Sequence, residues 1–181
     1  MKKIEIFVRH CKVSKFSKDR ERIRGFSKEE CYKNLKQTID KSLTNITFMM
    51  DGDLNDHFLK NEKEYKIAPI EGGSQAMSWQ STLEYVNNNN FSDDQIIYFL
   101  EDDYLHRNNW NKTLLEGFDL NVDYIGLYDH LDKYKLPLYK KLQSKILISN
   151  SCHWRTVPST TLSFAVKFKT FKKHFNIYKK F

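Results

Sequence analysis

The sequence predicts an α/β fold with a mostly parallel central sheet flanked by helices. Apolar runs of strand length at residues 4–8, 46–50 and 96–100 alternate with stretches of helical periodicity, a pattern typical of βαβ units. The run at 96–100 is unbroken, as expected of a central strand covered on both faces. With 181 residues, the chain suits one domain, residues 1–181.

Composition narrows the class of protein. The formal charge of +7 arises from 30 Lys and Arg against 23 Asp and Glu, which favours anionic partners. The basic residues are scattered, whereas a nucleic-acid site more often shows a dense basic stripe, so we expect no nucleic-acid partner. Three widely spaced cysteines without a C-x-x-C pattern indicate a reducing cytoplasm and no disulfide framework. No stretch has membrane-spanning length, and residues 1–12 lack the apolar core of a signal peptide.

The first predicted strand, residues 4–8, ends in Arg9, His10 and Lys12. These basic groups either meet a phosphate or are solvated loop charges, and the sequence leaves both open. A polar basic loop follows at 15–24, and Ser27 with Glu30 forms a capping box that predicts a helix start. One apolar face of this helix consists of residues at i, i+4 and i+8, namely Cys31, Leu35 and Ile39.

The second predicted strand, residues 46–50, ends in Asp51 beside Gly52. Such an Asp can bind a base or ribose in a nucleotide site, although an ordinary Asp-Gly turn explains it as well. The stretch Glu71-Gly72-Gly73-Ser74 opens a second helix, whose apolar face is Trp79, Leu83 and Val86. Two glycines there permit close approach of a phosphate to the helix N-terminus, and a plain N-cap is the simpler alternative.

Three carboxylates, Glu101, Asp102 and Asp103, follow the strand at 96–100. Adjacent acids repel one another, and ligands of open α/β sheets bind at the carboxyl ends of the strands. A divalent cation carrying a phosphorylated ligand would reconcile these two facts.

The last third continues the alternation. A third helix spans Trp110 to about Gly117, and a strand at 124–128 ends in polar residues. A basic connector at 135–145, an apolar run at 146–148, a half-buried strand at 162–168 and a basic helix at 169–180 complete the prediction.

The order of these features resembles the nucleotide-sugar glycosyltransferases of the GT-A fold, whose D-x-D motif ends a strand in this way. The stretches YFLEDDYLHRNNW, DYIGLYDHLDKY and HWRTVPSTTLSFAVK further resemble small bacterial and viral GT-A-like proteins. This resemblance covers residues 4–168 and implies a single GT-A-like domain with a Rossmann-like nucleotide-binding half. It implies a metal-dependent, inverting glycosyltransferase that moves a sugar from a nucleotide-diphosphate sugar to a glycan or lipid-linked acceptor hydroxyl, in surface glycan synthesis.

The resemblance also implies roles for individual residues. Asp103, with His153 as a further ligand, would bind Mn²⁺ or Mg²⁺. Glu101 would lie nearer the ribose, and Asp51 would recognise the nucleoside with Gly73 packed near it. The implied donor site comprises Arg9, Asp51, Gly72, Gly73, Glu101, Asp102 and Arg155, with no specific ligand assigned to Asp102.

An inverting enzyme needs a carboxylate to deprotonate the acceptor. Asp129 is the first candidate and Asp132 the second, although a helix cap or a surface salt bridge explains either nearly as well.

The chain departs from the GT-A pattern in two ways. Its motif begins with Glu, and it ends at Phe181, soon after the stretch HWRT, whereas these enzymes commonly carry the acceptor site beyond the second half of the sheet. We therefore expect it to lack the usual C-terminal acceptor region. Two alternatives remain. One is a nucleotidyl- or phosphotransferase, which needs Lys or Arg over the phosphates, and no Walker motif is present. The other is a basic nucleic-acid-binding module. Peripheral membrane association and the oligomeric state stay open.

Overall fold

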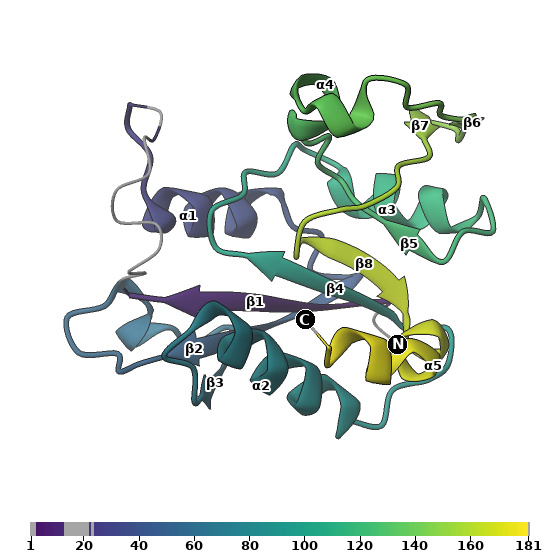
Figure 1. Cartoon of the computed structure of the whole chain (residues 1–181). Helices are drawn as coiled ribbons and strands as arrows, with labels where there is room; N and C mark the ends of the chain where they lie inside the picture. Colours follow the sequence, from purple (N-terminus) through teal and green to yellow (C-terminus); the bar gives the residue numbers. More distant parts are fainter. Residues whose placement is uncertain (1–2, 13–21, 23, 181) are drawn as a thin grey trace.

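The computed structural model describes residues 3–12, 22 and 24–180, so most of the basic loop predicted at 15–24 lies outside the described residues. Helices cover both faces of a six-stranded sheet with the order β3-β2-β1-β4-β8-β5 (Figure 1). The strands are β1 (Ile4–Cys11), β2 (Thr44–Asp51), β3 (Lys66–Ile70), β4 (Ile96–Glu101), β5 (Tyr124–Ile125) and β8 (Phe164–Lys167). This architecture confirms the predicted α/β class and the mostly parallel sheet.

The parallel half of the sheet is centred on β1. Strand β1 pairs with β2 on one side and with β4 on the other, and β2 pairs with β3. The sequence analysis missed β3, which is a short edge strand containing Pro69. An edge position tolerates a proline because its missing N–H need not join the ladder. Since the chain moves outward from β1 through β2 to β3 and then returns to β4, the strand order reverses between β1 and β4.

The other half of the sheet is antiparallel. Strand β8 lies between β4 and β5 and runs opposite to both. The alternating pattern at 162–168 predicted a half-buried strand, but Phe164, Ala165 and Val166 are all buried, because Ala165 packs into the core on one face of the sheet and the other two into the core on the opposite face. Strand β5 covers only two of the five residues predicted at 124–128.

Four helices form the two layers. Helices α1 (Lys28–Thr38) and α3 (Trp110–Phe118) cover one face, and α2 (Gln75–Asn87) and α5 (Phe168–Tyr178) cover the other (Figure 1). The predicted caps are present: Ser27 accepts a hydrogen bond from the N–H of Glu30, and Ser74 accepts one from Met77. The buried face of α2 is the predicted set of Trp79, Leu83 and Val86. Each layer therefore has its own apolar core.

A small lobe stands on the α1–α3 side, above β8 in Figure 1. It contains α4 (Asp132–Lys135), the short 3-10 helix η2 (Pro137–Tyr139) and the antiparallel pair β6 (Ile146–Ile148) and β7 (His153–Arg155). A second 3-10 helix, η1 (Phe58–Asn61), precedes β3. Trp154 anchors the lobe to α3, where an added Cβ on Gly117 would lie only 3.0 Å from the indole. Within the described residues, no helix combines the length and apolarity needed to cross a bilayer.

Candidate functional site

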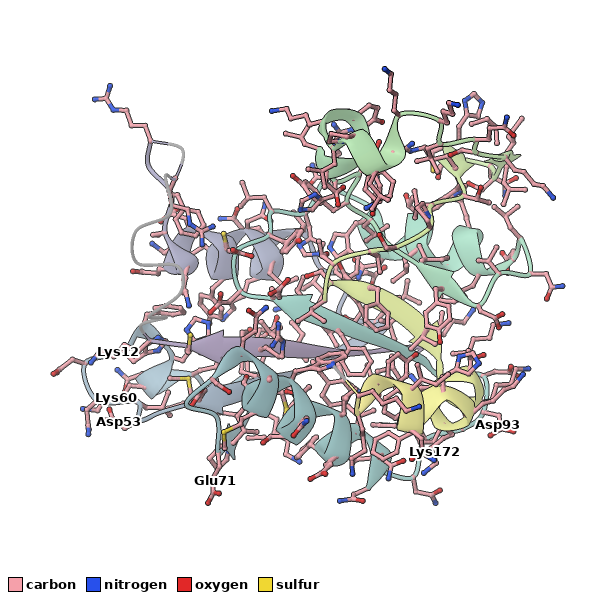
Figure 2. All side chains as sticks on the ribbon, in the orientation of Figure 1. Lys12, Asp53, Lys60, Glu71, Asp93 and Lys172 are labelled. Carbon is pink, nitrogen blue, oxygen red and sulfur yellow. The ribbon has the colours of Figure 1, made fainter. Side chains whose placement is uncertain are left out.

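The reversal of strand order between β1 and β4 marks the candidate site, because ligands of open α/β sheets bind in the crevice at such a point. Arg9 on β1 and Glu101 on β4 are paired in register. An Nη atom of Arg9 donates to Glu101 Oε1 at 3.0 Å. Lys12 and Asp53 are labelled at this end of the molecule, and Lys172 and Asp93 at the other (Figure 2).

Arg9 is an unusually buried cation, with 8% of its surface exposed. Its guanidinium lies 5.5 Å from the ring centre of Trp79 and also donates to the carbonyl of Gln75, the first residue of α2, at 3.4 Å. Burial lowers its pKa below the ordinary value, although the neighbouring Glu101 and Asp102 oppose this effect. The Nε atom has no hydrogen-bond partner among the described residues. The fold therefore places a buried cation at this end of the sheet, held by Trp79, Gln75 and Glu101.

Asp102 is the centre of a buried polar network. Its Oδ2 atom lies 2.7 Å from Lys28 Nζ and 2.9 Å from His10 Nδ1, and it accepts from the N–H of Cys11 at 3.3 Å. Burial alone would raise the pKa of Asp102, but His10 and Lys28 together bring it below the ordinary value. For Lys28, burial acts to lower the pKa, and Asp102 outweighs it and raises the pKa.

The hydrogen bonds around His57 assign the protons of two histidines. His57 Nδ1 accepts from the N–H of Leu59 at 3.1 Å, so the proton of a neutral His57 is on Nε2. This Nε2 lies 2.9 Å from Nε2 of His10, which must then be the acceptor. The proton of His10 is consequently on Nδ1 and faces Asp102. Burial, with repulsion from His10, lowers the pKa of His57. Asp102 is thus held as an anion by the ammonium of Lys28 and the Nδ1–H of His10.

Asp103, the predicted metal ligand, is paired with Arg22 at 2.9 Å. All three acids of the cluster therefore have a basic partner. No group of three His, Cys, Asp or Glu within the described residues is arranged to hold a metal ion. Mg²⁺ usually keeps several waters and takes only one or two carboxylates together with substrate phosphates. These residues fit an ion held mainly by a ligand, with Asp103 contributing, and do not fit a cage built by the protein alone.

The structure brings Asp51 together with Gly72 and Gly73. The N–H of Gly73 donates to the Asp51 carboxylate at 3.1 Å. A Cβ added to Gly72 would lie 1.9 Å from Asp51 Oδ2, so this carboxylate occupies the space that only glycine leaves. Gly73 has φ +80°, a conformation that favours glycine. The pair thus joins the end of β2 to the loop before α2.

The remaining predicted residues gather in the lobe. Asp129 lies 2.5 Å from an Nη atom of Arg155 and accepts from the hydroxyl of Tyr134 at 2.5 Å. These two hydrogen bonds lower its pKa, and a carboxylate with a lowered pKa is a weaker base. Asp132 is held by Lys133 at 2.9 Å, and this contact likewise lowers the pKa of Asp132.

His153 and Arg155 lie on β7, in the two-stranded sheet of the lobe. Arg155, predicted to contact a phosphate, is bonded to Asp129 instead of to any group at the crevice. No hydrogen bond or ion pair among the described residues joins His153 to Asp103. The metal site of Asp103 and His153 and the role of Asp129 as base therefore stay predictions. No described contact brings these three residues into one site.

Sequence reasoning missed Lys28, His57 and Arg22. A signal existed for Lys28, which is the first residue of α1. A cation at a helix N-terminus faces the positive end of the helix dipole, so its presence there indicates a nearby anion. His57 lies in the loop before η1, and its contact with His10 is a tertiary one that nothing in its sequence neighbourhood marks.

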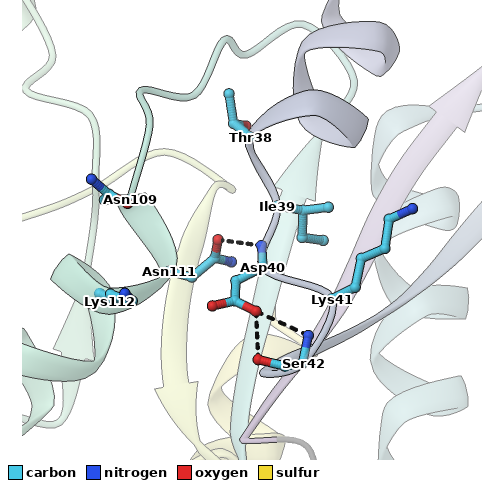
Figure 3. Close-up of a pocket in the computed structure, with 8 residues that line it drawn as sticks. All are labelled: Thr38, Ile39, Asp40, Lys41, Ser42, Asn109, Asn111 and Lys112. Atoms are coloured by element: carbon cyan, nitrogen blue, oxygen red, sulfur yellow. Dashed lines mark hydrogen bonds between the residues drawn. The ribbon is translucent and has the colours of Figure 1, made fainter.

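A separate recess of about 410 Å³ lies near the start of β2 and the N-terminal end of α3 (Figure 3). Its polar groups largely bind one another. Asn111 accepts from the N–H of Asp40 at 2.9 Å, and Asp40 accepts from the N–H and the hydroxyl of Ser42. We therefore interpret the recess as part of a turn that these hydrogen bonds stabilise. It lies at the end of β2 opposite Asp51.

Comparison with known proteins gives similarity in structure only. No family model matches the sequence, and no curated protein matches it. The structure is similar to the bifunctional IspDF from Campylobacter jejuni, with a TM-score of 0.52, 16% sequence identity and 99% of this chain covered. The chain spans 44% of the length of that protein. A second similar structure, 4-diphosphocytidyl-2C-methyl-D-erythritol synthase from Anaerococcus prevotii DSM 20548, has a TM-score of 0.49, 10% identity, and coverage of 99% of this chain and 76% of that one.

The similarity to IspDF corrects the glycosyltransferase prediction. That protein is an IspD-type nucleotidyltransferase and is not named as a glycosyltransferase. The prediction of glycosyl transfer from a nucleotide sugar was wrong because a strand ending in acids beside a glycine-containing loop is common to the wider nucleotide-binding fold. At 16% identity, the similarity supports the fold alone, an α/β domain with a mostly parallel central sheet flanked by helices.

Proposed function

We propose that the chain is a nucleotidyltransferase that binds a nucleoside triphosphate in the crevice between β1 and β4. The observation that carries this proposal is Arg9, a buried guanidinium in register with Glu101 at the point where the strand order reverses. A nucleotidyltransferase without a Walker motif needs a basic side chain over the phosphates. Arg9 meets this need at the edge of the sheet where such ligands bind.

In the proposed reaction, an acceptor oxygen attacks the α-phosphorus of the nucleotide. The bond from that phosphorus to the bridging oxygen breaks, and pyrophosphate leaves with the electron pair. Negative charge then grows on the leaving group, and a preorganised guanidinium stabilises it more than it stabilises the bound substrate. Arg9 suits this role because its planar donors match phosphate oxygens and its position is fixed by Trp79 and Glu101.

The surrounding residues take supporting roles in the proposal. Asp51, held by Gly73, would bind the nucleoside. Asp103 would hold a divalent ion, Mg²⁺ or Mn²⁺, which neutralises phosphate charge when bound. Arg22 and Lys28 add positive charge beside the acids. The acceptor is a hydroxyl or a phosphate on a second substrate, and the lobe above β8 is its proposed side of entry.

Thermal unfolding with CTP, UTP, ATP and GTP, each with and without Mg²⁺, tests the proposal. A ligand at about 100 times its Kd adds about 2.7 kcal/mol to the free energy of unfolding. For a chain of this size, this corresponds to a rise in Tm of roughly 5–10 °C. We expect such a rise with at least one triphosphate, its near-complete loss in Arg9→Met, and partial retention in Arg9→Lys, each measured against the ligand-free Tm of the same variant.

Lys112→Met is the matched control, because Lys112 is an exposed cation beside the recess of Figure 3 and its replacement should leave the rise intact. Product analysis separates the chemistry: nucleotidyl transfer releases pyrophosphate, whereas phosphoryl transfer releases a nucleoside diphosphate. Equal stabilisation of wild type and Arg9→Met, or a nucleoside diphosphate as the only product, would contradict the proposal.

A further inference from the structure

Charge is divided very unevenly along the chain. Residues 133–181 contain twelve Lys and Arg and no Asp or Glu, whereas residues 1–132 contain all 23 acids. Such an asymmetry indicates contact with an anionic surface. In the lobe, Lys135, Lys140, Lys141 and Lys145 are exposed. None of these four forms an ion pair with a described residue, so their charge is available to a partner.

The same lobe exposes large aliphatic side chains. Leu138 is 81% exposed and Ile148 is 67% exposed. Ile146 and Ile148 alternate along β6 and so share one face, while Leu147 between them pairs with Trp154, the residue that packs against α3. The inner face of the hairpin is thereby anchored, and its outer face presents two isoleucines to solvent. The exposed apolar residues of the lobe are Leu131, Tyr134, Leu136, Leu138, Ile146 and Ile148.

From these two observations we propose that the lobe docks on an anionic lipid membrane. Lysines attract a surface of negative headgroups, and exposed Leu and Ile gain free energy by entering the boundary between headgroups and acyl chains. Nucleic acid would use the lysines but not the aliphatic side chains, since single strands stack on aromatic rings. An acidic protein would need no such concentration of exposed aliphatic groups beside unpaired lysines. The lobe therefore acts as a peripheral anchor that brings the crevice close to the bilayer.

Sedimentation with phosphatidylcholine vesicles, with and without 30 mol% phosphatidylglycerol, measures this binding. We expect binding to the anionic vesicles that weakens in salt. Each lysine near the surface contributes roughly fivefold in partitioning. Lys140→Glu with Lys141→Glu should therefore lower partitioning at least about 25-fold, and Leu138→Ser should lower it roughly tenfold without changing its salt dependence.

Two controls use α5, which lies on the other face of the sheet, and Lys180, which follows the end of α5 at Tyr178 (Figure 1). Lys173→Glu with Lys180→Glu changes the net charge by the same amount at exposed positions, and Ile177→Ser removes an exposed aliphatic side chain of the same kind. Both should bind vesicles like wild type. Circular dichroism and Tm confirm that each variant is folded. Equal loss of vesicle binding in the α5 controls, or no binding to anionic vesicles, would overturn the proposal. So would a protein that binds an oligonucleotide and no vesicles, if the lobe variants lose that oligonucleotide binding. Nucleotide-induced stabilisation should persist in all lobe variants, so this test is independent of the proposed catalytic function.

Discussion

Replacing Asp102 by Asn tests whether the polar network below the crevice stabilises the fold. Asn has nearly the same shape and no charge. In the wild type, one carboxylate oxygen lies close to Lys28 Nζ at 2.7 Å and His10 Nδ1 at 2.9 Å. The amide of Asn can accept one of these hydrogen bonds, but its NH₂ group must then face another donor. The substitution therefore leaves a partly buried ammonium without its counter-charge.

The size of the effect follows from burial. The side chains of Asp102 and Lys28 are 13% and 19% exposed, so solvent screens their interaction only partly. Removing one partner of a buried ion pair costs about 3–5 kcal/mol, and the residual exposure places the expected loss near the lower limit, at about 3 kcal/mol. For 181 residues, this lowers Tm by roughly 6–12 °C.

Urea denaturation of Asp102→Asn, Lys28→Met and the double variant measures the coupling. Since the double variant no longer buries an unpaired charge, its loss should be smaller than the sum of the single losses by more than about 1 kcal/mol. Asp53→Asn is the control, because Asp53 is an exposed carboxylate at the same end of the molecule, and we expect a change within about 0.5 kcal/mol. Additive single losses, or an Asp102→Asn variant as stable as wild type, would refute the network as described.

Three further predictions concern single substitutions, two of them at glycines and one at a buried histidine. Gly72→Ala should displace the Asp51 carboxylate, whose Oδ2 lies 1.9 Å from the added Cβ, and so weaken nucleotide-induced stabilisation. Gly73→Ala should instead lower the free energy of unfolding by about 1 kcal/mol, because φ is +80° in open space. His106 has a pKa lowered by burial from 6.5 to about 4, so only the unfolded state takes up its proton between these values. Stability should fall by about 3 kcal/mol as pH drops from 6.5 to 4. In His106→Gln, this part of the pH dependence of the urea midpoint should disappear, and an unchanged pH profile would contradict it.

The sequence was informative wherever a short-range pattern carried the information. The apolar run before Glu101 predicted β4 and the acids at its end, and Ser27 and Ser74 predicted two helix starts. The partners of those acids could not be predicted, since Arg22, Lys28 and His57 reach the crevice only through tertiary packing. Strand β3 was missed because an edge strand of five residues with a proline has neither length nor alternation. The prediction of glycosyl transfer from the acids after β4 was wrong for a related reason. Such a motif indicates a type of ligand site, but it does not indicate which bond of the ligand is broken.

The place of β8 in the sheet has a consequence for biosynthesis. This strand occupies an interior position between β4 and β5, yet it comes from the last tenth of the chain. Until the ribosome has released residues 164–167, β4 keeps one bare edge and β5 has no neighbour. An unpaired apolar edge is prone to join the edge of another molecule. A nascent chain of this protein is therefore exposed to aggregation until residues 164–167 have left the ribosome and paired with β4 and β5.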